Sequence, residues 1–345
     1  MKYIISAMLL AVQFFSCHPS NIRHVERNGF LMDTVIRISL YDLRSEKSLH
    51  KLADDVFTYM LSIENLVSAY IQGSDVQRLN QEAGGDFSPV SKDTQHILQS
   101  ALQISEKTEG SFDITIGPLK TIWGFDTNSQ PRVPDVAEIQ TYLKLGNYHQ
   151  VELKDGSARI SVPGLGIDLG GIAKGYIIDA AVRWLQDAGV LGGLIECGGD
   201  LRVFGHHPDK RTWKIGIQNP RNERGSLIGI ASLNDLSIAT SGDYERFFIK
   251  DGTRYHHILD PETGFPSRGA ISVTVIAPDA MTADALATAV FVMGAERGLS
   301  LIDTIPDVET LIVTEKEDGM VYHFSAGAHE MIQMINSAKT QSAVQ

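Results

Sequence analysis

Cysteine is scarce in this 345-residue sequence, and positive charge is in the minority. The only two cysteines are Cys17 and Cys197, a number that excludes the disulfide frameworks of small secreted domains. Lysine and arginine number 30 against 42 aspartates and glutamates, so the formal net charge is -12 at pH 7. Such a surface repels phosphate backbones, and we set nucleic-acid binding aside. An anionic small ligand would need a local cation or a helix N-terminus.

Long hydrophobic runs are also missing. The one apolar run, residues 4–15, follows Lys2 and is too short to span a bilayer comfortably. It predicts a signal peptide, and its end at Ser16-Cys17 resembles a bacterial lipoprotein signal. We therefore expect residues 1–17 to form a lipoprotein signal peptide that ends at the lipidated Cys17, which becomes the N-terminus and membrane anchor, with residues 18–28 as a short tether. The alternative is a plain secretory signal with an incidental cysteine.

The composition that remains, 43% hydrophobic and 21% charged, is that of a globular protein. Helical spacing of apolar residues predicts helices over residues 45–70, 91–110, 135–145, 168–190, 281–293 and 295–303. Strands are predicted over residues 29–41, 151–153, 158–162, 194–195, 213–217, 228–233, 246–250, 255–259, 271–277, 309–313 and 321–324. The irregular mixture of elements and the short turns favour a single mixed α+β domain over residues 29–335, with a polar tail at 336–345.

A glycine-rich segment, Asp168-Leu-Gly-Gly-Ile-Ala-Lys174-Gly175, precedes the helix predicted around residues 172–190. Its backbone N–H groups and the Lys174 ammonium would suit a phosphate. It matches neither the Walker loop nor the dinucleotide fingerprint. The segment could equally be a tight turn that packs a helix on a sheet.

Asp284 and Thr288 stand four residues apart and so share one helix face. Both offer oxygen, which Mg²⁺ prefers, usually together with water and substrate phosphates. The alternative is that Asp284 only complements the helix dipole while Thr288 faces the core.

Three further stretches hold candidate site residues. His256 and His257 end a predicted strand before an Asp-Pro turn; His257 could be a general base, and one of the pair should face solvent. Phe112, Trp123 and Phe125 could line a pocket for a flat ring or could be core aromatics. Residues 238–244 are predicted to form a polar glycine turn between strands.

The order of these motifs along the chain resembles the ApbE family. The matching segments are Met32-Asp-Thr34, Ser68-Ala-Tyr70, Gly110-Ser-Phe-Asp113, Asp168 to Gly175, Gly198-Gly-Asp200, Thr240 to Tyr244, His257 to Pro261 and Ala283 to Thr288. They extend from about residue 29 to about residue 325. The resemblance implies the T-fold-like single domain of that family and FAD:protein FMN transferase activity, in which FMN from FAD is joined to a threonine or serine of an acceptor protein with release of AMP.

The resemblance also implies roles for individual residues. FAD would be contacted by Met32, Tyr70, Ser111, Phe112, Asp113, Asp168, Lys174 and Ile258. Mg²⁺ would be held by the Gly171 carbonyl, Asp284 and Thr288, with the Met281 carbonyl as a further candidate ligand. Catalysis would rest on His257 as base, on Asp284 and on the charge of Lys174.

The implied partners are FAD and the flavoprotein subunits of Nqr- and Rnf-type redox complexes. The expected location is outside the cytoplasm, on a lipid anchor that faces the periplasm, because no acidic residue directly follows Cys17. Two other functions fit the same residues. One is a Mg²⁺-dependent FAD pyrophosphatase, with water in place of the acceptor, and the other is a non-enzymatic, lipid-anchored flavin-binding protein of the periplasm.

Overall fold

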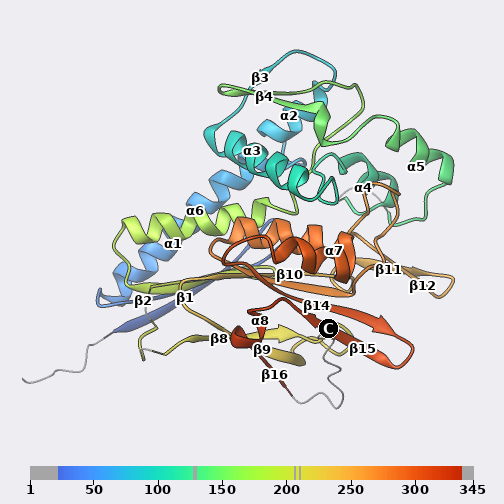
Figure 1. Cartoon of the computed structure of the whole chain (residues 1–345). Coiled ribbons are helices and arrows are strands. Elements are labelled where there is room, and N and C mark those ends of the chain that lie inside the picture. The colour runs from blue at the N-terminus through green and yellow to red at the C-terminus, as the bar shows by residue number, and fades with distance from the viewer. Residues whose placement is uncertain (1–21, 127–129, 206, 210, 336–345) are drawn as a thin grey trace, which may run out of the picture.

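The computed structural model describes residues 22–126, 130–205, 207–209 and 211–335. The predicted signal peptide, Cys17 and the tail at 336–345 lie outside the described residues. An eight-stranded sheet runs through the molecule in the order β1-β2-β6-β7-β10-β13-β14-β15, with all neighbours antiparallel (Figure 1). Its strands are β1 Arg23–Leu31, β2 Thr34–Asp42, β6 Gly192–Cys197, β7 Asp200–Gly205, β10 Ser237–Gly242, β13 Ser272–Ala277, β14 Glu309–Lys316 and β15 Gly319–Phe324. The predicted mixed α+β fold class is confirmed.

Three long helices cover one face of this sheet (Figure 1): α1 Glu46–Val67, α6 Ala173–Asp187 and α7 Ala280–Ile302. Ser45 caps α1 by accepting a hydrogen bond from the Ser48 amide. Helix α7 is long and apolar enough to cross a membrane, but its packing on β10, β13, β14 and α6 explains that composition. Gly294, at φ 77°, interrupts α7, at the position where the sequence predicts a break between two helices.

A small sheet covers part of the opposite face. It contains β8 Trp213–Gln218, β9 Leu227–Leu233 and β16 Ile332–Met334, beside the short helix α8 Ala328–Met331. Trp213 and Ile228 pack there with Leu194 and Val203 of the main sheet, in a core separate from the one under α1 and α6.

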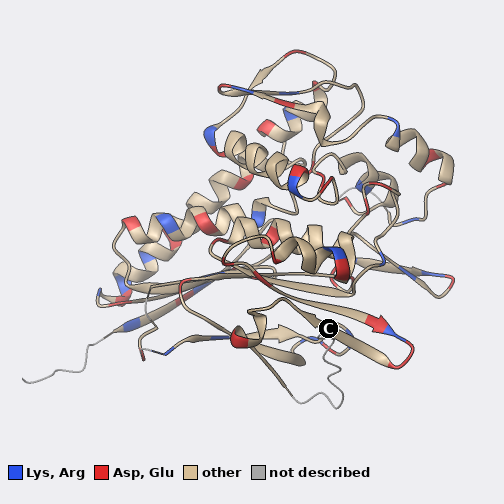
Figure 2. Cartoon of the chain, viewed as in Figure 1, with Lys and Arg blue, Asp and Glu red and all other residues tan. Residues whose placement is uncertain are grey.

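The remaining elements form a cap above the helices and a side hairpin (Figure 1, and in the same view Figure 2). The cap holds α2 Asp75–Gln81, α3 Lys92–Lys107, α4 Gly117–Trp123, α5 Val136–Leu143, a 3₁₀ turn at Tyr148–Gln150 and the strands β3 Ser88–Pro89, β4 Val151–Lys154 and β5 Ser157–Ile160. The hairpin is β11 Phe247–Lys250 with β12 Thr253–His256.

Antiparallel pairing gathers several turns at one end of the main sheet. The β1–β2 turn at Met32-Asp33, the β6–β7 turn at Gly198-Gly199 and the end of β10 at Gly242 all lie there, because Ile36 pairs with Cys197, Cys197 with Asp200, and Ile238 with Leu201. Segments far apart in the sequence thereby meet beside the N-terminal halves of α6 and α7.

Three sequence predictions are corrected. Residues 29–41 are not one strand, because Met32 (φ 52°) and Asp33 (φ 57°) form a two-residue turn with left-handed backbone, a conformation that aspartate tolerates. Residues 23–28 are not tether but part of β1, where Val25 is buried in the core. Residues 238–242 are not a turn but β10, a central strand whose polar Thr240 and Ser241 mask the strand pattern.

Candidate active site

A cavity of about 1070 Å³ opens between that end of the sheet, the N-terminal parts of α6 and α7, and the cap. It brings together nearly all the residues that the sequence predicts for the site. Its lining includes Met32, Tyr70, Ser111, Phe112, Asp113, Asp168, Gly171, Lys174, His257, Ile258, Asp284 and Thr288.

Met281 is the exception among the predicted site residues inside the described chain. It is not part of the cavity lining, and its amide donates to Oδ2 of Asp179 on α6 at 2.9 Å. Asp179 also accepts from the Ala280 amide at 2.9 Å, so it caps the N-terminus of α7 from a neighbouring helix. Helix α7 is thereby held at a fixed position against α6.

A buried cluster of one lysine and two aspartates lies at the inner end of the cavity. Nζ of Lys174 contacts Asp200, and it lies 2.9 Å from Oδ1 of Asp284. Burial disfavours the Lys174 ammonium, but the two carboxylates outweigh that effect and raise the pKa of Lys174. Burial raises the pKa of Asp200 to about 7, against the opposing attraction of Lys174. Asp200 belongs to a segment that the sequence singles out, but its partnership with Lys174 depends on a long-range contact that spacing does not reveal.

Hydroxyl oxygens of α7 and β10 lie close together near this cluster, and the glycine-rich segment passes beside them. Oγ1 of Thr288 lies 3.3 Å from Oγ of Ser241, and a Cβ added to Gly171 would lie 3.4 Å from the same Thr288 oxygen. The set of one carboxylate and neutral oxygens fits a Mg²⁺ ion that also binds water and substrate phosphate. Among the described residues there is no group of three or more His, Cys, Asp or Glu that could hold a metal ion.

Lys120 is a cavity residue that sequence reasoning missed. Its Nζ lies 2.7 Å from Oδ2 of Asp168, and the Tyr70 hydroxyl donates to the same oxygen at 2.9 Å. Burial raises the pKa of Asp168, but Lys120 outweighs burial, and with the Gly170 amide and Tyr70 it holds that pKa below its usual value. Lys120 belongs to α4, a short helix without a clear periodic pattern, so no local sequence pattern indicates its role.

The loop at residues 110–113 contributes mainly the ring of Phe112 to the cavity wall. Asp113 accepts from the Thr115 amide at 2.7 Å and from the Tyr148 amide at 3.0 Å, so both carboxylate oxygens hold the loop. Phe112 lines the cavity, whereas Trp123 packs in a separate core and donates from Nε1 to the Gly264 carbonyl at 2.8 Å. Phe125 packs in that same core, so only one of the three candidate aromatics lines the cavity.

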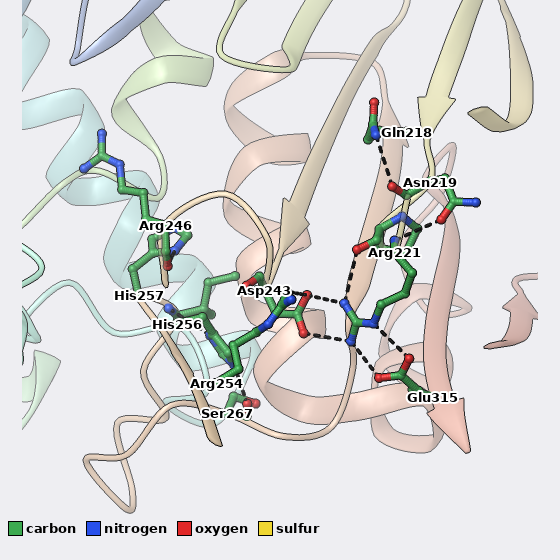
Figure 3. Close-up of polar contacts among 12 residues, drawn as sticks. Gln218, Asn219, Arg221, Asp243, Arg246, Arg254, His256, His257, Ser267 and Glu315 are labelled. Atoms are coloured by element: carbon green, nitrogen blue, oxygen red, sulfur yellow. Dashed lines mark hydrogen bonds and ion pairs between the residues drawn. The ribbon is translucent and has the colours of Figure 1, made fainter. Parts of the chain in front are cut away.

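The two histidines have separate environments (Figure 3), because His256 is buried whereas His257 is partly exposed. His256 is buried; its Nε2 donates to the Ser267 carbonyl at 2.7 Å and its Nδ1 accepts from the Ile258 amide. His257 lines the cavity, and its Nδ1 donates to the Arg246 carbonyl at 3.2 Å, which leaves Nε2 with a free lone pair. Burial, together with the charges of Lys120 and Arg246, lowers the pKa of His257 to about 3.

An arginine outside the cavity braces the turn that carries Arg246 (Figure 3). Arg221 binds both oxygens of Asp243, at 2.8 and 3.0 Å, and both oxygens of Glu315 on β14, each at 2.8 Å. Such paired, bidentate contacts give directional rigidity. The wall of the cavity at residues 243–246 is thus tied to β14 and to the loop before β9.

Comparison with known proteins gives a consistent result. The sequence model of the ApbE family matches residues 32–312. A curated FAD:protein FMN transferase from Vibrio cholerae is 32% identical, with 88% of this chain and 91% of that protein covered, and one from Treponema pallidum is 33% identical, with 85% of each covered. The crystal structure of the ApbE protein of Thermotoga maritima superposes with a TM-score of 0.81 at 36% identity, covering 90% of this chain and 99% of that one. The flavin transferase ApbE of Vibrio cholerae gives the same TM-score and coverage at 30% identity.

Proposed function

This chain belongs to the ApbE family, and we propose that it is an FAD:protein FMN transferase that uses Mg²⁺. The observation that carries the proposal is the convergence in one cavity of a buried ammonium, Lys174, with the oxygens of Asp284 and Thr288. A cation beside hard oxygen ligands suits a pyrophosphate, and the cavity volume of about 1070 Å³ leaves room for a ligand as large as FAD.

In the proposed reaction an acceptor hydroxyl attacks the FMN-side phosphorus of FAD. A new P–O bond joins FMN to the acceptor, the bond to the AMP phosphate breaks, and AMP leaves. Phosphoryl transfers of this kind depend on positioning and on neutralising charge rather than on covalent chemistry of the protein. Lys174, held charged by Asp200 and Asp284, provides one fixed positive charge for that purpose.

Asp284, Thr288 and the Gly171 carbonyl would hold the Mg²⁺ ion. When bound, the ion supplies Lewis-acid neutralisation of the phosphate oxygens. Phe112 and Ile258, which are buried at the cavity wall, would exclude water from the flavin nucleotide. Met32 would be placed by its amide, which donates to Oε1 of Glu64 at 2.7 Å.

His257 is the proposed proton acceptor for the attacking hydroxyl. Its low pKa keeps the imidazole neutral at physiological pH, and its free Nε2 lone pair can take a hydrogen bond from the acceptor. A base with so low a pKa is a weak one, so the main effect of His257 would be to orient the hydroxyl of the acceptor protein. Asp284 is the second candidate for taking the proton.

We further propose that the protein is exported and anchored through Cys17, and that its acceptor is a flavoprotein subunit of an Nqr- or Rnf-type complex. Support comes from the apolar run at residues 4–15, which ends at the Ser16-Cys17 pair. Labelling of the protein with a radioactive fatty acid, and its loss in a Cys17→Ser variant, would test the anchor.

One experiment separates transfer from hydrolysis. The full-length protein in detergent is incubated with FAD, Mg²⁺ and a purified Nqr-type flavoprotein domain, and both in-gel flavin fluorescence and AMP are measured. Fluorescent acceptor with matching AMP supports the transferase, AMP without fluorescence supports the pyrophosphatase, and neither product leaves only flavin binding.

A further inference from the structure

An exposed apolar pair lies at the outer mouth of the cavity. Phe30 and Val35 face each other across the β1–β2 hairpin and are 65% and 62% exposed. Their neighbours in sequence, Leu31 and Ile36, are fully buried, because successive strand residues point to opposite faces of the sheet. Phe30 and Val35 therefore project from the face opposite to α1.

That face is exposed at Phe30 and Val35 but covered further along the hairpin. Further along the hairpin, Tyr41 packs against Trp213 of the small sheet with ring centroids 5.7 Å apart, and Leu194 is buried there. Near Phe30 and Val35 no described element covers the sheet face. The border is polar, because Arg37 of β2 pairs with Glu196 of β6 at 2.7 Å.

Phe30, Val35, Arg37 and Glu196 belong to the lining of the same cavity that holds Lys174 and Asp284. The cavity thus has an inner end with charged groups, where Lys174 lies between Asp200 and Asp284, and an outer end that is apolar with a self-neutralised border. Two adjacent exposed apolar side chains that also line a cavity are a surface feature typical of a binding site.

We propose that the surface formed by Phe30, Val35 and the Arg37–Glu196 pair, here called the hairpin platform, docks the polypeptide segment of the acceptor that carries the modified hydroxyl. The inference rests on the proposed transferase function. FAD is a poorer occupant, because the platform offers its phosphates no unpaired cation. The segment would place an apolar side chain on Phe30 and Val35 and its serine or threonine towards the inner end of the cavity.

The area of the platform suits a transient complex. Two side chains and a polar border bury far less than a permanent interface does, and an enzyme that modifies many acceptor molecules must release each product. Most of the affinity would come from a small apolar anchor.

The test uses Phe30→Asp and Val35→Asp, with Leu43→Asp as the matched control. Leu43 is also an exposed apolar residue, at 55%, but follows the far end of β2. Full-length proteins in detergent are assayed for transfer of flavin to an Nqr-type flavoprotein domain at varied acceptor concentration. FAD binding and acceptor-free release of AMP are measured in parallel.

The expected result is a rise of at least tenfold in the KM for the acceptor in both platform variants, with FAD affinity, AMP release and the control unchanged. Unchanged acceptor KM in both variants overturns the platform while leaving the transferase intact. A loss of FAD affinity also overturns it, because Phe30 would then belong to the nucleotide site. If an aspartate variant fails to fold, Phe30→Ser and Val35→Thr replace it. A wild-type protein that binds FAD but labels no acceptor overturns the proposed function itself.

Discussion

The backbone amide of Gly175 donates a hydrogen bond of 3.1 Å to Oδ2 of Asp284, which joins α6 to α7 inside the cavity. The preceding residue, Lys174, contacts the other carboxylate oxygen at 2.9 Å. Asp179, one turn further along α6, caps the first amides of α7. The position of Asp284 is therefore fixed by four hydrogen bonds between the two helices, which is the arrangement a preorganised site requires.

Gly175→Ala is expected to move Asp284. A Cβ at this position would lie 2.2 Å from the Ala280 carbonyl oxygen, a backbone atom that cannot rotate away, so α6 and α7 must separate. We expect a loss of about 1 to 3 kcal/mol in the free energy of unfolding and a fall in transfer rate at temperatures where the variant is folded. Urea unfolding and steady-state transfer assays measure the two effects.

Gly298→Ala in α7 is the matched control. Its added Cβ would lie 2.7 Å from a side-chain atom of Val290, remote from the carboxylate of Asp284, so it should cost stability without changing transfer in the folded protein. Equal kinetic effects of the two substitutions would contradict the idea that helix spacing positions Asp284.

Asp284→Asn should remove the main ligand of the proposed Mg²⁺ ion while leaving the fold intact, because Lys174 keeps its contact with Asp200. We expect transfer to fall by about a hundredfold or more, as when a key electrostatic group is lost. The half-saturating Mg²⁺ concentration should rise. Titration calorimetry with Mg²⁺ in the presence of FAD, and rates at varied Mg²⁺, provide the measurements. Asp303→Asn, at the exposed far end of the same helix, is the control, and a fully active Asp284 variant would rule out the metal assignment.

Local patterns in the sequence predict much of this site because the informative residues sit on regular elements. Asp284 and Thr288 share a helix face whatever the rest of the fold does, and the glycines ahead of α6 mark a segment that passes close to Thr288. The β4–β5 hairpin follows from Asp155-Gly156, whose turn geometry is local.

The missed features depend on contacts between distant segments. The role of Lys120 depends on its ion pair with Asp168, and that of Arg221 on its ion pairs with Asp243 and Glu315. The strand β10 resembles a turn because its polar Thr240 and Ser241 line a cavity instead of a core. Functional demands on a strand thus remove the apolar alternation by which strands are recognised.

Lys120→Met should destabilise the protein more than an ordinary surface change, because it leaves the Asp168 carboxylate buried without its cation. Side-chain exposure is 13% for Lys120 and 6% for Asp168, and breaking a buried pair on one side costs about 3 to 5 kcal/mol. The double variant Lys120→Met, Asp168→Asn should recover part of that stability but not FAD affinity. Denaturant unfolding and FAD titration measure both, and equal stability of the single and double variants would argue against a buried ion pair.

His257 should make the stability of the protein depend on pH. Its pKa in the folded state, about 3, is below the ordinary value of 6.5, so the unfolded chain binds a proton that the folded chain refuses. The contribution is fully present above pH 6.5 and is lost progressively as pH falls towards 3. Between pH 7 and pH 5 the loss attributable to this group is about 1 to 2 kcal/mol.

Replacing His257 with Gln, which does not titrate, should flatten the fall in the free energy of unfolding over that interval relative to wild type, measured by urea unfolding at each pH. The same substitution at His323, whose pKa is lowered less and which lies outside the cavity, serves as the comparison. Parallel pH curves for wild type and the His257 variant would show that this imidazole is not held neutral by the fold.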